Sequence, residues 1–312
     1  MQEGVKTIDI SRVKEDLIEQ LSDSIAIEEP LRIFIVQESE NGKVIREAGI
    51  ILRTPGQDEE LAVGYLFNEG ILQETTEIKN IFKEDGDYNS IYLLMDEKRP
   101  LGIQNKINPR KVLSSCGICG STDRNDLLEN LPVKTTRHRL SLPVNIFFAL
   151  KEKLNHEQRI FKNTGGLHAA GLFSHKGDLI MIREDIGRHN ALDKICGHAF
   201  IEKKLPLSNC ILLLSGRTGF ELIQKAAMAQ IPVIASIGAP SSMAIEAAEE
   251  TGITLIGFLG KDKFNVYTCF DNIITKHLKQ GENHIEDLQL NPAPTAHSGV
   301  DPISLPVANE LK

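Results

Sequence analysis

Short apolar runs alternate with helical segments through the second half of the chain, and this alternation limits the folds open to it. A run such as Ile211-Leu212-Leu213-Leu214 is apolar at every position, so helices should cover both faces of its sheet. Strands separated by helices usually pair in parallel. The expected elements are helix 143–155, strands 166–173 and 179–184, helix 191–203, strand 210–214, helix 219–230, strand 232–236, helix 241–250 and strands 253–258 and 264–268. The pattern predicts a three-layer α/β/α domain over residues 136–282, with a mixed, mostly parallel sheet.

A smaller α+β domain is expected over residues 1–112. Strands are predicted at 31–37, 48–52 and 91–95, and a helix should begin with Asp58 as its N-cap and stop at Gly70. Residues 113–135 form an expected linker between the two domains. The segment 283–312 is rich in Pro, Ala, Ser, Asn and acidic residues, which predicts a flexible tail.

Composition narrows the class of protein. The chain has 312 residues and a net charge of −8, which disfavours sequence-independent binding to nucleic acid or anionic lipid. No apolar run approaches the roughly 18 residues of a membrane span, and the polar N-terminus lacks a signal-like core, so a cytoplasmic protein is expected. Five cysteines without an export signal argue against a disulfide framework. Cys196 and Cys210 fall in a predicted helix and strand, where buried apolar roles are expected.

The motif Cys116-Gly117-Ile118-Cys119-Gly120 carries the most chemistry. A Cys-x-x-Cys pair can exchange disulfides, hold half of a zinc site or carry a persulfide, and each role needs a thiolate. Arg110 and Lys111 lie just upstream and would favour the anionic sulfur. A thiol oxidoreductase usually places such a pair after an early strand, and one pair supplies only half of the usual zinc ligands. The position between two domains favours a mobile arm that delivers sulfur, but a thiol oxidoreductase and a zinc-stapled cofactor-binding chaperone stay open.

Two predicted strand-to-helix junctions suit an anionic ligand. The first contains Ser215, Gly216 and Arg217, followed by Thr218 and Glu221 at the spacing of a capping box. The second contains Ser241, with Pro240 near the first helical position. Both follow neighbouring strands, where open α/β sheets bind ligands. Plain helix capping would explain either junction alone, whereas the two together favour a phosphate-bearing ligand. Neither the P-loop motif nor the G-x-G-x-x-G fingerprint is present.

A polar cluster joins the strand at 179–184 to the next helix. Asp185, Arg188 and His189 could bind a polar ligand or transfer protons, and Asn190 is expected to cap the helix. A turn carrying surface charge is the alternative explanation. His168 lies on a strand of small residues, which fits an interior histidine or one beside a ligand.

The order of these motifs resembles the FdhD family, the accessory sulfur carriers for formate dehydrogenase. The resemblance spans about residues 29–268. It rests on Thr54-Pro55-Gly56, Asp58-Glu59-Glu60-Leu61-Ala62, Glu69-Gly70-Ile71, Ser115–Gly120, Thr164-Gly165-Gly166-Leu167-His168-Ala169-Ala170, Glu184–Ala191 with Asp193-Lys194, Ser215-Gly216-Arg217 and Val266-Tyr267-Thr268.

The resemblance implies a function. Such proteins take sulfur from a cysteine desulfurase as a persulfide on the cysteine pair, here Cys116 and Cys119. They pass it to the molybdenum (or tungsten) bis(molybdopterin guanine dinucleotide) cofactor, a bound substrate that a guanine nucleotide partly mimics, before formate dehydrogenase receives it. The resemblance also implies a homodimer and a C-terminal domain similar in fold to cytidine deaminases. The resemblance implies no residues of this chain that bind a metal ion of its own.

The resemblance also assigns cofactor-binding residues. The family's binding loop corresponds here to Phe258, Leu259, Gly260, Lys261, Asp262 and Lys263. Its two lysines keep the loop cationic, while Gly260 and Asp262 leave one fewer anion contact than an Arg-rich loop would have. With this loop, Ser215, Gly216, Arg217, Ser241 and His189 are the expected cofactor contacts. Deamination is not expected, because deaminases bind zinc with a P-C-x-x-C motif inside the sheet domain, whereas Cys116 precedes that domain here.

Overall fold

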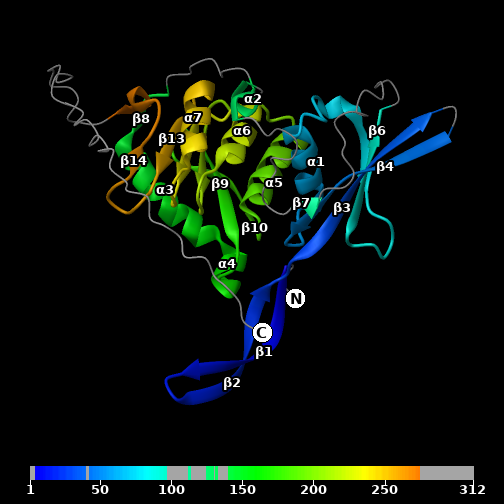
Figure 1. Ribbon diagram of the computed structural model, residues 1–312, viewed down its shortest axis with the longest axis horizontal. Coiled ribbons are helices and arrows are strands. Elements are labelled where there is room, and N and C mark those ends of the chain that lie inside the picture. The colour runs from blue at the N-terminus through cyan, green and yellow to red at the C-terminus, as the bar shows by residue number, and fades with distance from the viewer. Residues whose placement is uncertain are drawn as a thin grey trace, which may run out of the picture. The chain divides into compact units, whose positions relative to one another are not determined.

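The computed structural model describes residues 4–39, 42–96, 112–113, 124–129, 131–132 and 140–274, which all belong to one compact unit (Figure 1). The predicted tail lies outside these residues, and the predicted domain boundaries stay a prediction. Around one helix, α1 (Asp58–Asn68), the N-terminal half forms a five-stranded sheet and a separate hairpin. The sheet has the order β5-β6-β3-β4-β7, with β3 Glu29–Ser39, β4 Gly42–Arg53, β5 Ile78–Phe82, β6 Ser90–Met95 and β7 Val112–Leu113. The predicted strands and helix of this half are confirmed.

The C-terminal half contains a six-stranded sheet of order β10-β9-β11-β12-β13-β14. Its strands are β9 His168–Ser174, β10 Leu179–Asp185, β11 Cys210–Leu214, β12 Val233–Ser236, β13 Thr254–Gly257 and β14 Asn265–Val266. Its helices are α3 Val144–Glu157, α4 Arg159–Thr164, α5 Arg188–Ile201, α6 Phe220–Met228 and α7 Ser242–Thr251. Short pieces complete the described chain: 3-10 turns Thr75–Glu77 and Phe270–Asn272, α2 Arg124–Glu129, and β8 Leu142–Pro143 paired with β15 Ile273–Ile274.

The prediction of a mostly parallel sheet is wrong. Only the pairs β11–β12 and β12–β13 are parallel, while β9 and β10 form an antiparallel hairpin that runs antiparallel to β11. The last pair, β13–β14, is also antiparallel. The reason is chain connection: β9 and β10 are joined by a tight turn, and a tight turn can only make an antiparallel pair. The predicted α/β class with a mixed sheet is confirmed.

Helices cover both faces of this sheet, as the apolar strands predicted. Leu212 and Leu214 of β11 belong to a core that includes residues of α5, α6 and α7. Ile211 and Leu213 point the other way, into a second core with Phe147 of α3. Alternate residues of one strand thus face opposite layers, because the side-chain period of a strand is two.

Helix α1 joins the two halves of the described chain. Almost all of its residues are buried, including Leu61, Val63 and Leu66, as expected of a helix enclosed by other elements. It packs against α5, and one continuous core contains Leu31 and Ile33 of β3 together with the α5 side of the larger sheet. The two predicted domains therefore share a hydrophobic core.

Two glycines let α1 and α5 approach closely. A Cβ added to Gly64 would overlap the carbonyl oxygen of Asp193 and lie 2.8 Å from the amide nitrogen of Gly197. A Cβ added to Gly197 would overlap the carbonyl oxygen of Glu60 and lie 2.7 Å from the nitrogen of Gly64. The helices thus touch backbone to backbone, which any larger residue would prevent.

A buried charged pair lies beside this crossing. Lys225 Nζ of α6 is 2.7 Å from both carboxylate oxygens of Asp193 in α5, and Asn68 Nδ2 of α1 donates to Asp193 Oδ1 at 2.6 Å. Burial lowers the pKa of Lys225, but the charge and hydrogen bonds of Asp193 outweigh it and raise that pKa above its ordinary value. Three helices are tied together at one carboxylate.

Two predicted helix caps are wrong. Asp58 lies inside the helix, after Gln57, and its carboxylate binds the guanidinium of Arg53, with Oδ1 2.9 Å from Nε. Helix α5 begins before Asn190, whose side chain instead donates to the carbonyl of Leu52 and to Asp185. Asp58 also accepts from Lys83 Nζ at 2.7 Å, and Leu52 is 138 residues from Asn190, so the local capping pattern could not reveal either set of contacts.

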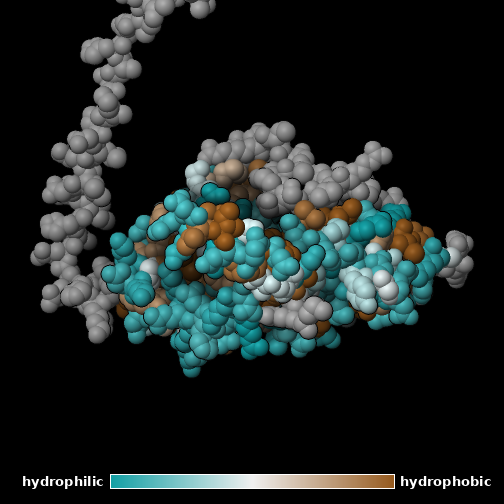
Figure 2. All heavy atoms as spheres, turned by 90° about the horizontal axis from the view of Figure 1, so that it is seen from below, coloured by the Kyte–Doolittle hydropathy of each residue, from teal (hydrophilic) through white to brown (hydrophobic). Residues whose placement is uncertain are grey.

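The hairpin β1 (Val5–Lys14) and β2 (Leu17–Ala26) was not predicted, because its strands carry charges on both faces. Val13, Leu17 and Ile18 near its turn are exposed. Figure 2, viewed from the end to which the hairpin points in Figure 1, shows a largely hydrophilic face with separate small apolar patches. No helix in the described part of the chain is long and apolar enough to cross a membrane.

The glycine contact should be sensitive to one methyl group. Gly64→Ala or Gly197→Ala should lower the free energy of unfolding by about 3 kcal/mol, because the added Cβ forces the two helix backbones apart. Urea unfolding of the full chain, followed by circular dichroism, measures this. As control, Gly166→Ala places its Cβ 3.8 Å from that of Ala26, an ordinary contact, and should cost less than about 0.5 kcal/mol. An unchanged urea midpoint for Gly64→Ala would contradict the close crossing.

Loss of the buried ion pair between Lys225 and Asp193 should destabilise the protein more than loss of an exposed ion pair. Lys225→Met leaves the Asp193 carboxylate buried without a counter-ion and should cost about 3–5 kcal/mol. The double variant Asp193→Leu/Lys225→Met should recover much of this loss, because no charge then remains buried. Lys204→Met, which removes an exposed partner of Glu202, should cost at most about 1 kcal/mol. Equal losses for the single and double variants would reject this account.

Candidate functional site at the ends of the central strands

The loops that follow β11, β12 and β13 lie side by side. The amide of Thr218 donates to Ala239 O at 3.1 Å, and the amide of Ser241 donates to Thr218 O at 2.9 Å. Further along the edge, the amide of Phe258 donates to Gly238 O at 3.1 Å. The three segments in which contacts were expected, 215–217, Ser241 and 258–263, are therefore neighbours at one sheet edge, where parallel strands end.

Glycines at this edge are required by close packing of the loops. A Cβ on Gly238 would lie 2.9 Å from the nitrogen of Arg217 and from the oxygen of Gly216. A Cβ on Gly216 would lie 3.1 Å from Nδ1 of His168. The loops thus pack backbone against backbone at these glycines, while the Arg217 side chain is exposed to solvent.

The two serines are held by the backbone. Ser215 Oγ accepts a hydrogen bond from the amide of Ala169 at 2.9 Å, which joins the end of β11 to β9. Ser241 is the N-cap of α7, and its Oγ accepts from the amide of Ala244 at 3.2 Å. The helix begins after this cap, so the prediction that Pro240 lies near its first position is wrong.

The predicted capping box at α6 is also wrong. Gly219 is the N-cap, without a side-chain cap, and Thr218 Oγ1 is buried with no hydrogen-bond partner among the described residues. Glu221 instead reaches α5, where its Oε2 lies 2.9 Å from Nε2 of His189. Sequence analysis missed this pair, because nothing in the local spacing links two helices that the fold alone brings together.

Three titratable side chains converge between β9, α5 and the loop after β11. His189 Nδ1 and Arg188 Nε are buried and have no hydrogen-bond partner in the described structure. Burial lowers the pKa of His168, and the nearby charges of Arg188 and His189 lower it further, against the opposing effect of Asp185. His168 is therefore neutral near pH 7. Buried donors and acceptors without partners are uncommon in folded proteins, and they mark this cluster as a place for a polar ligand.

Asp185 has a structural role. It is fully buried, its Oδ2 lies 2.8 Å from Lys194 Nζ, and its Oδ1 accepts from the amide of Gly187 at 2.9 Å. It also accepts from the amide of Thr54 in the N-terminal half. Asp185 thus fixes the turn that presents Arg188 and His189, and its carboxylate is fully engaged.

The expected cofactor loop has one buried and several exposed members. Leu259 is packed into the core on the α3 side, so it anchors the loop. Phe258 is 52% exposed and has a φ of 53°, a left-handed conformation that an aromatic residue seldom adopts. Gly260 and Lys263 close a turn through a 2.8 Å hydrogen bond, and Lys261, Asp262 and Lys263 are exposed.

Cys116 and Cys119, with Arg110 and Lys111, lie outside the described residues. The chain before them forms β7, which pairs with β4. Cys196 and Cys210 are buried, as predicted, and burial raises the pKa of both thiols, that of Cys196 to about 12. These two cysteines are therefore unsuited to thiolate chemistry near neutral pH.

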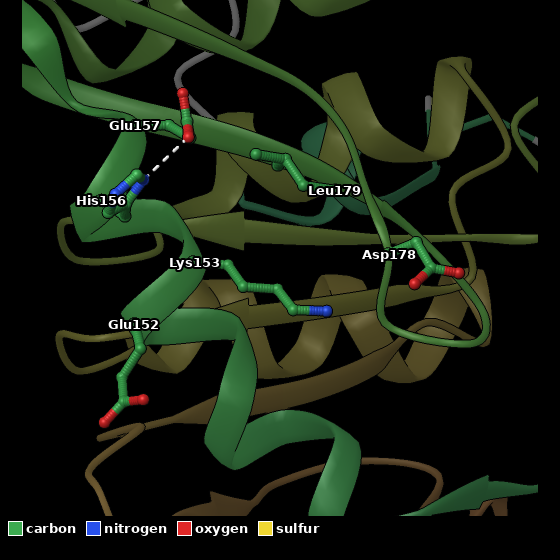
Figure 3. Close-up of a pocket in the computed structure, with 6 residues that line it drawn as sticks. All are labelled: Glu152, Lys153, His156, Glu157, Asp178 and Leu179. Carbon is green, nitrogen blue, oxygen red and sulfur yellow. Dashed lines mark hydrogen bonds and ion pairs between the residues drawn. The ribbon is translucent and has the colours of Figure 1, made fainter.

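A surface hollow of about 480 Å³ lies beside the C-terminal part of α3 (Figure 3). Glu152, Lys153, Glu157 and Asp178 line it, and Glu157 pairs with His156 at 2.9 Å. Lys153 extends toward the β9–β10 turn and donates to the Gly177 carbonyl. Mixed charges and open walls make it a poor site for an anion. Within the described ranges, no group of three His, Cys, Asp or Glu residues is placed to hold a metal.

Comparison with known proteins places this geometry in a family. The sequence profile of the FdhD/NarQ family matches residues 26–274. The sulfur carrier protein FdhD of Saccharolobus solfataricus is 40% identical over 272 residues, covering 86% of this chain and 98% of that protein. Its namesake from Streptomyces coelicolor is 40% identical over 279 residues, covering 85% and 94%. The crystal structure of a putative formate dehydrogenase accessory protein from Desulfotalea psychrophila has the same fold, with a TM-score of 0.66 and 22% identity over 86% of this chain and 99% of that one.

The profile match covers most of the chain, and the matched relatives align over nearly their whole length, so the chain belongs to the FdhD/NarQ family.

Proposed function

We propose that this protein is a sulfur carrier required for formate dehydrogenase activity. The observation that carries the proposal is 40% identity to sulfur carrier proteins over 98% of one relative's length, in a chain with the Cys116-x-x-Cys119 pair. The expected donor is a cysteine desulfurase, and the substrate is the molybdenum bis(molybdopterin guanine dinucleotide) cofactor before it enters formate dehydrogenase.

Cys116 accepts the sulfur. Its thiolate attacks the outer sulfur of the desulfurase persulfide, so that a new sulfur–sulfur bond forms on Cys116 while the old bond breaks and the desulfurase cysteine leaves as a thiolate. The exchange conserves the number of sulfur–sulfur bonds and needs no oxidant. Arg110 and Lys111 would stabilise the attacking thiolate.

Cys119 assists release. Its thiolate attacks the inner sulfur of the Cys116 persulfide, expels hydrosulfide toward the metal of the substrate and leaves a Cys116–Cys119 disulfide. The sulfur leaves with two electrons, which are supplied as the two cysteine thiols are oxidised to a disulfide. A cellular dithiol then reduces this disulfide back to two thiols.

The edge loops suit the substrate's nucleotide arms. Arg217, Lys261 and Lys263 are exposed cations at one sheet edge, beside the Ser215 and Ser241 hydroxyls. Buried His189 Nδ1 and Arg188 Nε in the neighbouring cluster lack partners in the described structure. Pyrophosphate groups would engage the cations and amides of these loops, with Phe258 beside them. The chain's own groups bind and orient the substrate, which supplies the metal.

The proposal extends to the fold type, the oligomeric state and the location of the protein. The alternation of helices and strands from α3 to β14 supports a fold similar to cytidine deaminases, without the zinc chemistry of those enzymes. A cytoplasmic homodimer that meets the desulfurase and formate dehydrogenase in turn is the expected working form.

Sulfur loading can be followed by mass spectrometry. After incubation with a cysteine desulfurase and free cysteine, the peptide containing Cys116 should gain the mass of one sulfur atom. Cys116→Ala should abolish the gain and the maturation of formate dehydrogenase, whereas Cys119→Ala should slow maturation. Cys210→Ala serves as control, because a buried thiol with a raised pKa should not carry sulfur. Loading that survives Cys116→Ala would reject the assignment, and rapid catalytic reduction of insulin disulfides would favour an oxidoreductase.

Nucleotide binding should depend on the cationic loops. Arg217→Ala and the pair Lys261→Ala/Lys263→Ala should each weaken binding of GDP about tenfold or more, because each removes a charged hydrogen-bond donor. Calorimetric titration at two salt concentrations measures the loss and its electrostatic origin. Lys176→Ala, on the β9–β10 turn, is the matched control and should bind normally. Equal affinity in all variants would place the nucleotide elsewhere.

A further inference from the structure

The loop that follows β11 leaves a small space in front of Gly216. A Cβ added to Gly216 would lie 3.1 Å from Nδ1 of His168 and 4.0 Å from Cδ of Arg188. His168 begins β9 and Arg188 begins α5, so three elements surround this point. Gly216 does not have a positive φ, so this position needs a glycine for the space and not for the backbone conformation. A sulfur atom is similar in size to the methyl group that an alanine would place here.

Arg188 brings an unpaired positive charge to this space. Its Nε is buried and has no hydrogen-bond partner in the described part of the chain. None of the ion pairs between described residues includes Arg188, and the Asp185 carboxylate is engaged by Lys194 instead. A buried guanidinium hydrogen without an acceptor is costly, so an anion bound at this point would remove that penalty.

His189 offers a second unpaired atom. The residue is 8% exposed, and its Nε2 lies 2.9 Å from the Glu221 carboxylate, which holds the ring from the α6 side. Its Nδ1 is buried and lacks a hydrogen-bond partner among the residues that the structure describes. When the ring is protonated both nitrogens are donors, so Nε2 binds Glu221 and Nδ1 offers a hydrogen to a ligand. His189 lies near the same space, because its charge, like that of Arg188, lowers the pKa of His168.

The charges around the space suit a small monovalent anion. Protonated His189 balances Glu221, and Lys194 balances Asp185. Among the described residues of this cluster, Arg188 alone then keeps an uncompensated charge. Its place at the start of α5, a helix of 14 residues, adds the favourable end of the helix dipole. A water molecule would leave that charge without a counter-ion, and a phosphate group is too large for a space that one methyl group would fill.

Hydrosulfide fits these requirements and has a source. It is a monovalent anion whose single heavy atom can accept both hydrogen bonds. The proposed function releases it when Cys119 attacks the Cys116 persulfide. His168 also lines a surface pocket of about 500 Å³ together with Ser215, which gives a small anion a route to the space.

We propose that the space between Gly216, Arg188 and His189 binds hydrosulfide through Arg188 Nε and His189 Nδ1, and holds sulfur released from the cysteine pair until the substrate accepts it. The inference rests on the proposed function for the origin of the hydrosulfide. The site retains sulfur that would otherwise diffuse into solution, a task different from binding the nucleotide arms of the substrate.

Calorimetric titration of the full chain with sodium hydrosulfide tests the binding. Oxygen is excluded and the cysteines are kept reduced, so that hydrosulfide has no sulfur–sulfur bond to attack. Arg188→Met, which removes the charged donor, should weaken binding about tenfold or more. Gly216→Ala should abolish binding by filling the space. His189→Gln keeps a partner for Glu221 but removes the atom at Nδ1, and should weaken binding about tenfold. Sodium bromide should compete with hydrosulfide, whereas sodium phosphate should not.

Two variants serve as matched controls. Arg159→Met removes an exposed cation from the first residue of another helix, α4. Gly219→Ala adds a methyl group on the same loop as Gly216, where it meets nothing within 4 Å. Both controls should bind hydrosulfide like the parent chain, and thermal unfolding of each variant verifies that the fold is intact.

The fate of the sulfur separates this inference from the proposed function. In a maturation assay with desulfurase, cofactor and formate dehydrogenase, Gly216→Ala and Arg188→Met should load Cys116 as the parent does but release more free sulfide into solution. Equal hydrosulfide affinity in the parent and in both variants, or no binding by the parent, overturns the inference, while persulfide loading of Cys116 still supports the proposed function. Failure of the parent to load Cys116 rejects the proposed function, whatever the hydrosulfide titration shows.

Discussion

The backbone contact between α1 and α5 is the constraint on which the rest of the structure depends. Gly64 and Gly197 allow two helices from different halves of the chain to meet without intervening side chains. The α1 side chains then fill the space between the two sheets, so a single core forms in place of two. The carboxylate of Asp193 lies at this crossing and takes its partners from α1 and α6, which fixes the helices in rotation as well as in distance.

This rigid crossing determines where the functional side chains lie. Helix α5 begins at the turn that Asp185 holds, and that carboxylate also accepts from Thr54 in the N-terminal half. The position of Arg188 and His189 therefore depends on contacts that cross between the halves. Glu221 of α6 then orients His189 from the other side. Precise placement of a binding group by a second layer of buried contacts is what a site for a large substrate requires.

The sequence was sufficient for the strands of the larger sheet, for helices α5, α6 and α7 and for the loops of the candidate site, because these follow from local patterns. Apolar runs marked the strands of the larger sheet, and glycine-rich junctions marked the loops at their ends. Non-local pairing defeated the finer predictions. Asp58, Asn190 and Glu221 each have the residue type and spacing of a helix-end group. Asn190 and Glu221 instead bind partners from distant elements, and Asp58 binds Arg53 at the end of the preceding strand.

Charge gives the last link between the fold and a sulfur carrier's task. The chain carries a net charge of −8, which would repel any anionic ligand at long range. At physiological ionic strength this repulsion fades beyond about 8 Å, so the local groups decide whether the substrate binds. Those groups are arranged with the opposite sign: Arg217, Lys261 and Lys263 gather where three parallel strands end, while His168 beside them stays neutral. A site built in this way attracts anionic groups at its rim despite the net charge of the whole chain, which is the property that the proposed binding of phosphate groups requires.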